Sequence, residues 1–245
     1  MALDLFSGTG SVCNAARARG ISAISLDRDM DANLKMDIMD FEYRNYPPTY
    51  FDFIWASPPC TENSKAKTTA PRKLDDANAI VKRTLDIINY LQPRCFVIEN
   101  PQTGLLKDQD FMQHLDYVDV DYCKYGFPYR KRARLWNNFK VELQQKVQPL
   151  CKKDCNSMNE ARTRHIAEAQ RMPSGKKATW GERRKFEQAE LYKVPDGLVS
   201  DVLDAAGFSG DASVLWASVF LSVSWKVLTV LMSSMSGFCL HTTSF

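Results

Sequence analysis

The chain has 245 residues, of which 44% are hydrophobic and 25% are charged, so it can bury one sizeable core and carry a small appended lobe. The formal net charge of +3 is too small to establish a polyanionic partner by itself. The seven cysteines are odd in number and several lie inside apolar stretches, which argues against a disulfide scaffold and indicates a reducing compartment.

The N-terminal residues run from Met1 directly into a glycine turn, without the charged leader or the long apolar segment of a secretion signal. The catalytic part is therefore expected to be intracellular. It would lie in the nucleus if the source is eukaryotic, and in the cytoplasm if the source is prokaryotic or a phage.

Short apolar runs alternate with helical patterns in the first part of the chain. The runs predict strands at residues 3–6, 21–26, 51–56 and 95–98. One helix follows the glycine turn at residues 7–11, and apolar positions at helical spacing predict another over residues 77–91. This alternation predicts an α/β fold with a doubly wound, mostly parallel, Rossmann-like sheet.

Polar or turn residues stand where each predicted strand ends. Gly8, Asp27, Cys60 and Glu99 follow four different strands. In open parallel sheets ligands bind at the carboxyl ends of the strands, so these four residues are expected to converge on one site.

The second part of the chain changes character. Residues 125–140 are basic and carry no acidic side chain, residues 151–190 are polar and charged, and residues 197–206 form a helical pattern that ends at Gly207. The predicted organisation is a cofactor-binding and catalytic domain at residues 1–140, a short basic target-recognition insertion at 141–190, a helix returning to the catalytic domain at 191–207, and an apolar tail at 208–245.

The glycine turn offers a sharp bend and helix N-terminal amides to a cofactor. Asp27, at the end of the second strand, could hold two ribose hydroxyls, and Asp37 with Ile38 could frame an adenine ring. Each of these residues also has an ordinary structural interpretation, as packing, a solvated strand end or a turn.

Two prolines hold Cys60 at a defined place after a strand, in the sequence Ser57-Pro58-Pro59-Cys60. A cleft with nearby arginines and peptide dipoles would favour its thiolate, the nucleophilic form. Glu99 ends the strand that follows the long helix, in a position suited to acid chemistry or to a simple strand cap.

Four motifs occur in a fixed order: Asp4-Leu5-Phe6-Ser7-Gly8-Thr9-Gly10-Ser11, then Ser57-Pro58-Pro59-Cys60 with Ser64 beyond it, then Glu99-Asn100, then Arg130-Lys131-Arg132-Ala133-Arg134. In this order and over most of residues 3–134 the chain resembles the C5-cytosine methyltransferase family. Beyond Arg134 the resemblance is weak. Residues 192–195 are only slightly similar to the family's closing motif, and Pro195 is the best-matching residue.

The resemblance implies transfer of a methyl group from S-adenosylmethionine to C5 of cytosine in DNA. Cys60 would attack C6, Glu99 would hold or protonate N3 and contact the exocyclic amine, and Arg132 and Arg134 would engage O2 and fix the ring and its loop. In a duplex the base would be flipped out. The cofactor would be bound by Phe6, Ser7, Gly8, Thr9, Gly10, Asp27, Asp37, Ile38 and Pro58.

Two positions near the chemistry depart from the family pattern. Arg130 stands where the family usually has glutamine, and Pro101 stands where valine usually follows the asparagine. The groups that do the chemistry are retained, so an altered substrate fit is expected rather than lost activity.

The interval 136–191 is where the family places target recognition, and its basic side chains could contact phosphates. They are Lys152, Lys153, Arg162, Arg164, Arg171, Lys176, Lys177, Arg183 and Arg184. Cys151, Cys155 and His165 have a spacing that could ligate zinc, but structural zinc takes four ligands and Cys123 is only a candidate for the fourth, so no metal is assigned from sequence.

Residues 214–232 are apolar except for serines, Thr229 and a central Lys226, which would be costly inside a bilayer. Membrane contact of this tail is not favoured, although a single-span anchor, a packed helix and a segment without function all stay open. No obligatory protein partner is inferred.

Three alternatives to DNA cytosine methylation also stay open. An amino-methyltransferase would carry an aromatic residue after Ser-Pro-Pro, where this chain has Cys60. A transfer-RNA cytosine enzyme would use the same nucleophile and acid on an unstacked base. A catalytically silent relative would bind nucleic acid without methyl transfer.

Overall fold

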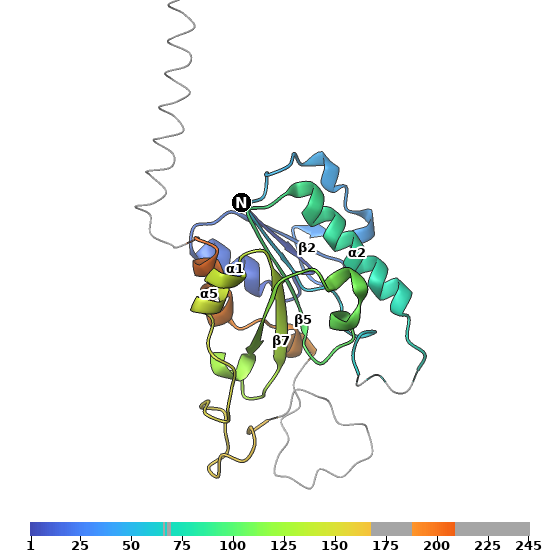
Figure 1. Cartoon of the computed structure of the whole chain (residues 1–245). Coiled ribbons are helices and arrows are strands. Elements are labelled where there is room, and N and C mark those ends of the chain that lie inside the picture. Colours follow the sequence, from blue (N-terminus) through green and yellow to red (C-terminus); the bar gives the residue numbers. More distant parts are fainter. Residues whose placement is uncertain (66, 68–69, 168–187, 209–245) are drawn as a thin grey trace, which may run out of the picture. The chain divides into compact units, whose positions relative to one another are not determined.

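The computed structural model describes residues 1–65, 67, 70–167 and 188–208, whose strands form one sheet in the order β3-β2-β1-β4-β5-β7-β6 (Figure 1). The strands are β1 (Ala2–Leu5), β2 (Ala23–Asp27), β3 (Leu34–Lys35), β4 (Phe53–Ala56), β5 (Cys95–Pro101), β6 (Tyr117–Asp121) and β7 (Arg132–Asn137). β3, β2, β1, β4 and β5 are parallel, whereas β7 runs antiparallel to both β5 and β6. The predicted doubly wound, mostly parallel α/β fold is confirmed.

Helices cover both faces of this sheet (Figure 1). The helices are α1 (Ser11–Ala18), α2 (Leu74–Leu91), α3 (Lys140–Lys146), α4 (Gln188–Tyr192) and α5 (Asp196–Ala205). α1, α3 and α5 share one apolar core, and α2 belongs to the core on the other face. Because successive strand side chains point to opposite faces, Leu3 and Leu5 join the α2 core while Ala2 joins the other.

The long helix α2 forms where apolar positions at helical spacing predict it. Ala77, Val81 and Ile88 are buried. The helix begins at Leu74, a turn earlier than the apolar pattern, because Asp75 and Asp76 place negative charge at its positive N-terminal end. The chain leaves it at Gln92 in the left-handed conformation, with Pro93 next.

The basic stretch contains a strand that its composition did not predict. Arg132 and Arg134 alternate with the buried Ala133 and Leu135 on β7, which pairs with β6 and places this hairpin at the edge of the sheet. A short 3-10 helix, η5 (Tyr122–Tyr125), follows β6. Charged side chains masked the period-2 pattern of β7 in the sequence.

The C-terminal helix α5 lies beside α1. The Arg19 side chain donates a hydrogen bond to the carbonyl of Ser200 and forms an ion pair with Asp204 at 3.0 Å. The helix is followed by Gly207 with a φ of 74°, as expected of a helix end. The boundaries drawn at residues 140, 190 and 207 stay predictions.

Several predicted features fall outside the described residues. These are the apolar tail at 214–232 and the basic residues Arg171, Lys176, Lys177, Arg183 and Arg184. Within the part of the chain that the structure describes, no helix is both long enough and apolar enough to cross a membrane.

Candidate active site

The turn after β1 is held in a backbone conformation that most residues avoid. Phe6, Gly8 and Gly10 have φ angles of 61°, 53° and 76°, all in the left-handed region. Glycine adopts this region freely, but a bulky residue such as Phe6 does so only where its surroundings hold it there. Such local strain occurs preferentially at ligand sites. The turn is thus shaped for a close backbone approach by a ligand.

Asp27 at the end of β2 connects this turn to the next loop. Its Oδ2 accepts a hydrogen bond from the backbone N–H of Gly8 at 2.8 Å, and its Oδ1 accepts from the N–H groups of Asp29 and Met30 at 2.9 Å each. A carboxylate offers about four lone-pair sites and three are used here, so Asp27 keeps about one acceptor site for a ligand while it fixes both loops.

Two other predicted cofactor residues lie at a short 3-10 helix after β3. Asp37 caps the 3-10 helix η1 (Ile38–Asp40) by accepting from the Met39 N–H at 2.9 Å, and it also faces Arg28 at 3.4 Å. Ile38 is buried in the α2 core. A surface hollow of about 460 Å³ is lined by Gly8, Thr9 and Gly10 together with the segment 30–33. Asp27, Asp37, Ile38 and Pro58 do not line it.

The loop that carries Cys60 is tied directly to the end of β5. The side-chain Nδ2 of Asn100 donates a buried hydrogen bond of 2.8 Å to the carbonyl of Pro58. At the start of the loop, Trp55 Nε1 donates to Ser57 Oγ at 2.9 Å. The Pro-Cys and Glu-Asn motifs, which lie far apart in sequence, therefore form one unit.

Glu99 is buried, with 5% of its surface exposed. Its Oε1 accepts a hydrogen bond of 3.1 Å from the hydroxyl of Tyr122, and the Lys131 Nζ lies 3.7 Å from the same oxygen. The ammonium of Lys131 also lies over the Tyr122 ring, 4.6 Å from its centroid. Burial and the neighbouring Glu99 carboxylate raise the pKa of the Tyr122 hydroxyl, so it remains a donor.

The pKa of the Cys60 thiol is raised, first by burial and then by the negative charge of Glu99, while Lys131 acts in the opposite direction. The sequence led us to expect nearby arginines to favour the thiolate. The structure instead assigns that effect to a lysine, and burial outweighs it. Cys60 and Glu99 are close enough to influence each other's charge, and Gly8 is bonded to Asp27, so the four residues predicted to converge meet as two pairs.

Arg132 and Arg134 make a different set of contacts. Arg132 pairs with Asp121 through bonds of 2.9 and 2.7 Å, and Arg134 pairs with Asp119 through bonds of 2.8 and 3.0 Å. These residues face each other across the β6–β7 ladder. The structure does not bring either guanidinium to Glu99 through a described hydrogen bond or ion pair.

Strand register explains why a lysine reaches Glu99. Leu135 is the cross-strand partner of Glu99, so the even-numbered arginines of β7 share a face with Asn100 rather than with Glu99. Lys131 is four residues from Leu135, and side chains an even number of residues apart share a face of the sheet, so Lys131 lies on the same face as Glu99. Sequence reasoning missed Lys131 and Tyr122, and the alternation within Lys131-Arg132-Ala133-Arg134 was the signal that could have identified the lysine.

A doubly wound sheet with a left-handed glycine turn after its first strand, and a Pro-Cys loop hydrogen-bonded to the Glu-Asn segment of β5, is the arrangement expected of a methyltransferase-type enzyme. Residues 2–122 match the family model described as C-5 cytosine-specific DNA methylase. The chain is 33% identical over 223 residues to the "Probable DNA (cytosine-5)-methyltransferase" of Frog virus 3 (isolate Goorha), covering 82% of this chain and 98% of that protein. The chain belongs to the C-5 cytosine-specific DNA methylase family.

A solved structure of an E. coli prophage protein, described as a candidate DNA modification methyltransferase, has a TM-score of 0.42 and 20% identity to this chain. The match covers 56% of this chain and 45% of that one, so this chain spans less than half the length of that protein. The family membership confirms the predicted activity, which is methylation of cytosine C5 in DNA. It implies S-adenosylmethionine as the methyl donor and DNA as the substrate.

Proposed function

We propose that this chain methylates a cytosine flipped out of duplex DNA through a covalent bond between Cys60 Sγ and C6 of the base. The observation that carries this mechanism is the Asn100–Pro58 hydrogen bond, because it fixes the cysteine loop to β5, the strand that carries Glu99. A nucleophile and an acid held on one rigid unit meet the geometric need of covalent catalysis.

C5 of cytosine is a poor nucleophile until a group adds to C6. Attack by the Cys60 thiolate forms the S–C6 bond and moves the ring electrons toward N3, where Glu99 holds or donates a proton. The resulting enamine is nucleophilic at C5. C5 would take the methyl group of the donor, which would leave as S-adenosylhomocysteine. Loss of the C5 proton to water then re-forms the C5–C6 double bond as the S–C6 bond breaks and the Cys60 thiolate leaves.

Cys60 enters this cycle as a thiol whose pKa is raised by burial and by Glu99. Lys131 is the nearby cation that opposes this effect, and its position 3.7 Å from Glu99 lets it balance both negative groups as the thiolate forms. Tyr122 orients the Glu99 carboxyl through their 3.1 Å hydrogen bond. We therefore add Lys131 and Tyr122 to the site as positioning residues.

The turn at Phe6, Ser7, Gly8, Thr9 and Gly10 fits a nucleotide-type cofactor. The Ser7 Oγ is buried without a hydrogen-bond partner among the described residues, so a bound group could satisfy it. S-adenosylmethionine supplies an electrophilic methyl group. We propose that Asp27 holds the ribose hydroxyls, that Asp37 and Ile38 frame the adenine, and that Pro58 borders the donor.

We retain Arg132 and Arg134 as the residues that engage cytosine O2 and hold the loop on the strength of the family motif alone, because the strand register places both on the Asn100 face rather than on the Glu99 face. Each guanidinium has five N–H donors and spends two of them on its aspartate, so donors remain for the base. The aspartate partners also fix the direction of each arginine, which reduces the entropy lost when the base binds.

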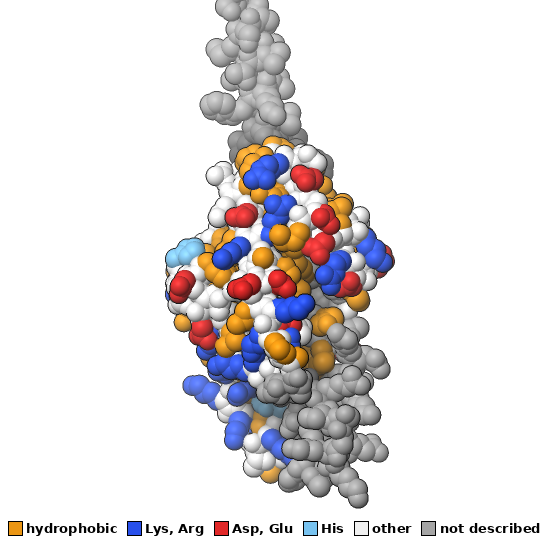
Figure 2. Space-filling view, turned by 90° about the vertical axis from the view of Figure 1, so that its right-hand side faces the viewer, with side chains coloured by type: hydrophobic (Ala, Val, Ile, Leu, Met, Phe, Trp, Pro, Cys, Tyr) orange, Lys and Arg blue, Asp and Glu red, His pale blue; other side chains and the backbone are white. Residues whose placement is uncertain are grey.

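The surface around residues 151–167 fits a DNA backbone. Lys and Arg side chains gather toward the lower end of the molecule in Figure 2, and Lys152, Lys153, Arg162 and Arg164 are exposed. Phosphate contacts of this kind position a protein on DNA without reading its sequence. We assign this segment to backbone contact beside the flipped cytosine.

The test is a covalent trap. The purified chain is incubated with radiolabelled S-adenosylmethionine and a duplex containing 5-fluorocytosine, which cannot lose its C5 substituent as a proton, and the products are separated under denaturing conditions. A labelled protein–DNA adduct that is absent from Cys60→Ala supports the mechanism. Label on the exocyclic amine, or full activity in Cys60→Ser, would overturn it. An adduct on transfer RNA but not on DNA would move the substrate to RNA.

A further inference from the structure

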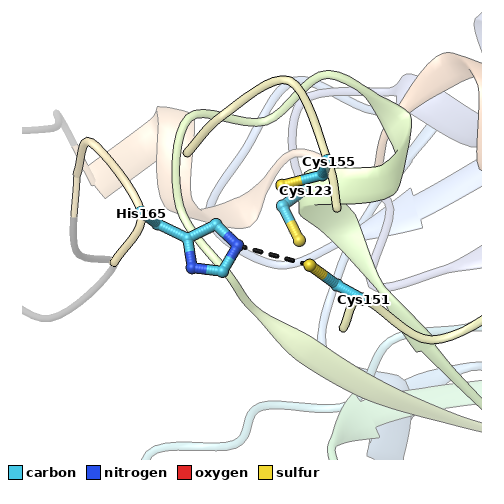
Figure 3. A group of neighbouring side chains, drawn as sticks. All are labelled: Cys123, Cys151, Cys155 and His165. Atoms are coloured by element: carbon cyan, nitrogen blue, oxygen red, sulfur yellow. Dashed lines mark hydrogen bonds between the residues drawn. The ribbon is translucent and has the colours of Figure 1, made fainter. Parts of the chain in front are cut away.

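A group of potential metal ligands lies outside the catalytic unit. Cys123 belongs to η5, whereas Cys151, Cys155 and His165 come from the segment after α3. Their ligand atoms all lie within 4.8 Å of one another, and Figure 3 shows the three thiols and the imidazole directed toward a common point. We propose that these four residues form a structural zinc site that fastens segment 151–165 to the β6–β7 hairpin.

The spacing of the four atoms suits a tetrahedral ion. Zinc–sulfur and zinc–nitrogen bonds of about 2.3 and 2.0 Å place neighbouring ligand atoms roughly 3.6–3.8 Å apart. Cys151 Sγ and His165 Nε2 are 3.6 Å apart. The widest separation, within 4.8 Å, closes with a shift of about 1 Å, which side-chain rotation supplies.

The donor set selects zinc over other metals. Three thiolates and one imidazole are soft to borderline ligands, and a closed set of four matches structural zinc rather than a catalytic ion that keeps an open position. All three cysteines are buried and free. A disulfide between any two of them would leave the third thiol and His165 in the cluster unexplained.

The segment has almost no other core. Among its described side chains, the buried ones are Cys151, Cys155 and Ser157, and the small apolar cluster there consists of Cys123, Cys151 and Cys155 with Met158 against them. A piece of chain this short cannot bury enough apolar surface to hold itself. A metal supplies the missing folding energy in such modules.

The charged groups around the cluster are of both signs. Three thiolates and Zn²⁺ would carry a net charge of −1; Lys124 is paired with Asp154, and Arg130 and Asp121 both act on His165. Lys153 has a φ of 67°, a left-handed turn between two of the ligands.

The proposed ion would connect directly to the active site. The backbone N–H of Cys151 donates to Asp121 Oδ2 at 3.0 Å, and the same carboxylate holds Arg132. On the other side of the cluster, Cys123 follows Tyr122, whose hydroxyl binds Glu99. Zinc would therefore hold segment 151–165 in place and, with it, the Asp121–Arg132 pair and the Tyr122–Glu99 hydrogen bond.

The first measurement is the metal content of the full chain, purified without chelator and with its tag removed. One zinc per chain is expected by plasma mass spectrometry, with release on titration of the thiols by a mercurial. Cys151→Ser and Cys123→Ser are expected to lose it. Cys95→Ser is the matched control, because Cys95 is buried but outside the cluster, and it should retain one zinc.

The second measurement does not depend on variants that fold poorly. Cobalt added to metal-stripped full-length protein should give visible d–d bands of tetrahedral Co²⁺ and thiolate charge-transfer absorption, and zinc should displace both. His165→Ala should keep the charge-transfer absorption but change the d–d bands. Absence of zinc from the purified protein together with absence of cobalt–thiolate absorption would overturn the proposal, as would a disulfide among the three cysteines in freshly prepared native protein.

Discussion

Replacement of Asn100 by alanine tests whether the two catalytic motifs work as one unit. Asn100 is 1% exposed, and its Nδ2 makes the 2.8 Å bond to the Pro58 carbonyl. Asn100→Ala removes the donor and leaves that carbonyl buried, which costs about 1–3 kcal/mol. At roughly 2–4 °C per kcal/mol for a domain of this size, the melting temperature should fall by about 2–12 °C.

The effect on catalysis should exceed the effect on folding. With its tether gone, the loop that carries Cys60 can shift, and a displacement of about 1 Å at a reacting group can lower the rate by roughly 100-fold. Single-turnover rates of adduct formation on the 5-fluorocytosine duplex should therefore fall well below wild type at a temperature where the variant is folded. Cofactor affinity should stay near wild type, because Asn100 does not line the glycine turn.

The matched control is Asn138→Ala, which removes exposed side-chain hydrogen bonds to Phe96 and Arg94 at the opposite end of β5. It should change melting slightly and leave the rate of adduct formation unchanged. If Asn100→Ala forms the adduct at the wild-type rate, the tether does not position Cys60 and the reasoning fails.

The remaining predictions concern charge and backbone strain. Asp4 is buried, and desolvation raises its pKa from 3.8 to about 7. The folded state therefore holds the Asp4 proton more tightly than the unfolded state does. The stability that this protonated carboxyl contributes is lost as pH rises from about 4 through 7. In urea unfolding, the free energy of unfolding of Asp4→Asn should rise relative to that of wild type by up to about 4 kcal/mol between pH 4 and pH 8. A difference between the two proteins that does not change with pH would refute the raised pKa of Asp4. Lys131→Met should raise the pKa of Cys60 further and move the pH–rate profile of adduct formation to higher pH, whereas the surface variant Lys140→Met should leave the profile in place. In Gly8→Ala the added Cβ makes only ordinary contacts, 3.9 Å from Tyr192 Cβ and 4.0 Å from the Phe6 carbonyl oxygen, but the residue must adopt a φ of +53°. About 1–2 kcal/mol of strain should therefore weaken S-adenosylmethionine binding measured by calorimetry, and unchanged affinity would contradict a close backbone approach.

Local patterns were enough to predict the centre of the molecule. The glycine turn, the proline-fixed Cys60 and the apolar strands each depend on neighbouring residues, so their spacing gives both fold and candidate site. Glu99 could be placed beside Cys60 because both follow parallel strands, whose carboxyl ends share one edge of the sheet.

The missed features all depend on pairing between distant segments. Lys131 reaches Glu99 only because β7 is antiparallel to β5 with Leu135 opposite Glu99, a register that a single sequence does not specify. The aspartate partners of Arg132 and Arg134 lie on β6, which composition alone did not identify. Cys123 could not be joined to Cys151 and Cys155 for the same reason, because only the hairpin brings η5 to that segment.

The reversed direction of β7 also sets how much chain is needed after it. β7 starts near the active-site edge and ends at Asn137, whose N–H bonds the carbonyl of Asp116 just before β6 begins. The chain must therefore travel back before Cys151 can meet Asp121, and α3, about 10 Å long, covers most of that return. Residues 138–150 connect β7 to Cys151 over a fixed length, so a deletion within α3 should pull segment 151–165 away from Asp121, although it changes no residue of the proposed site.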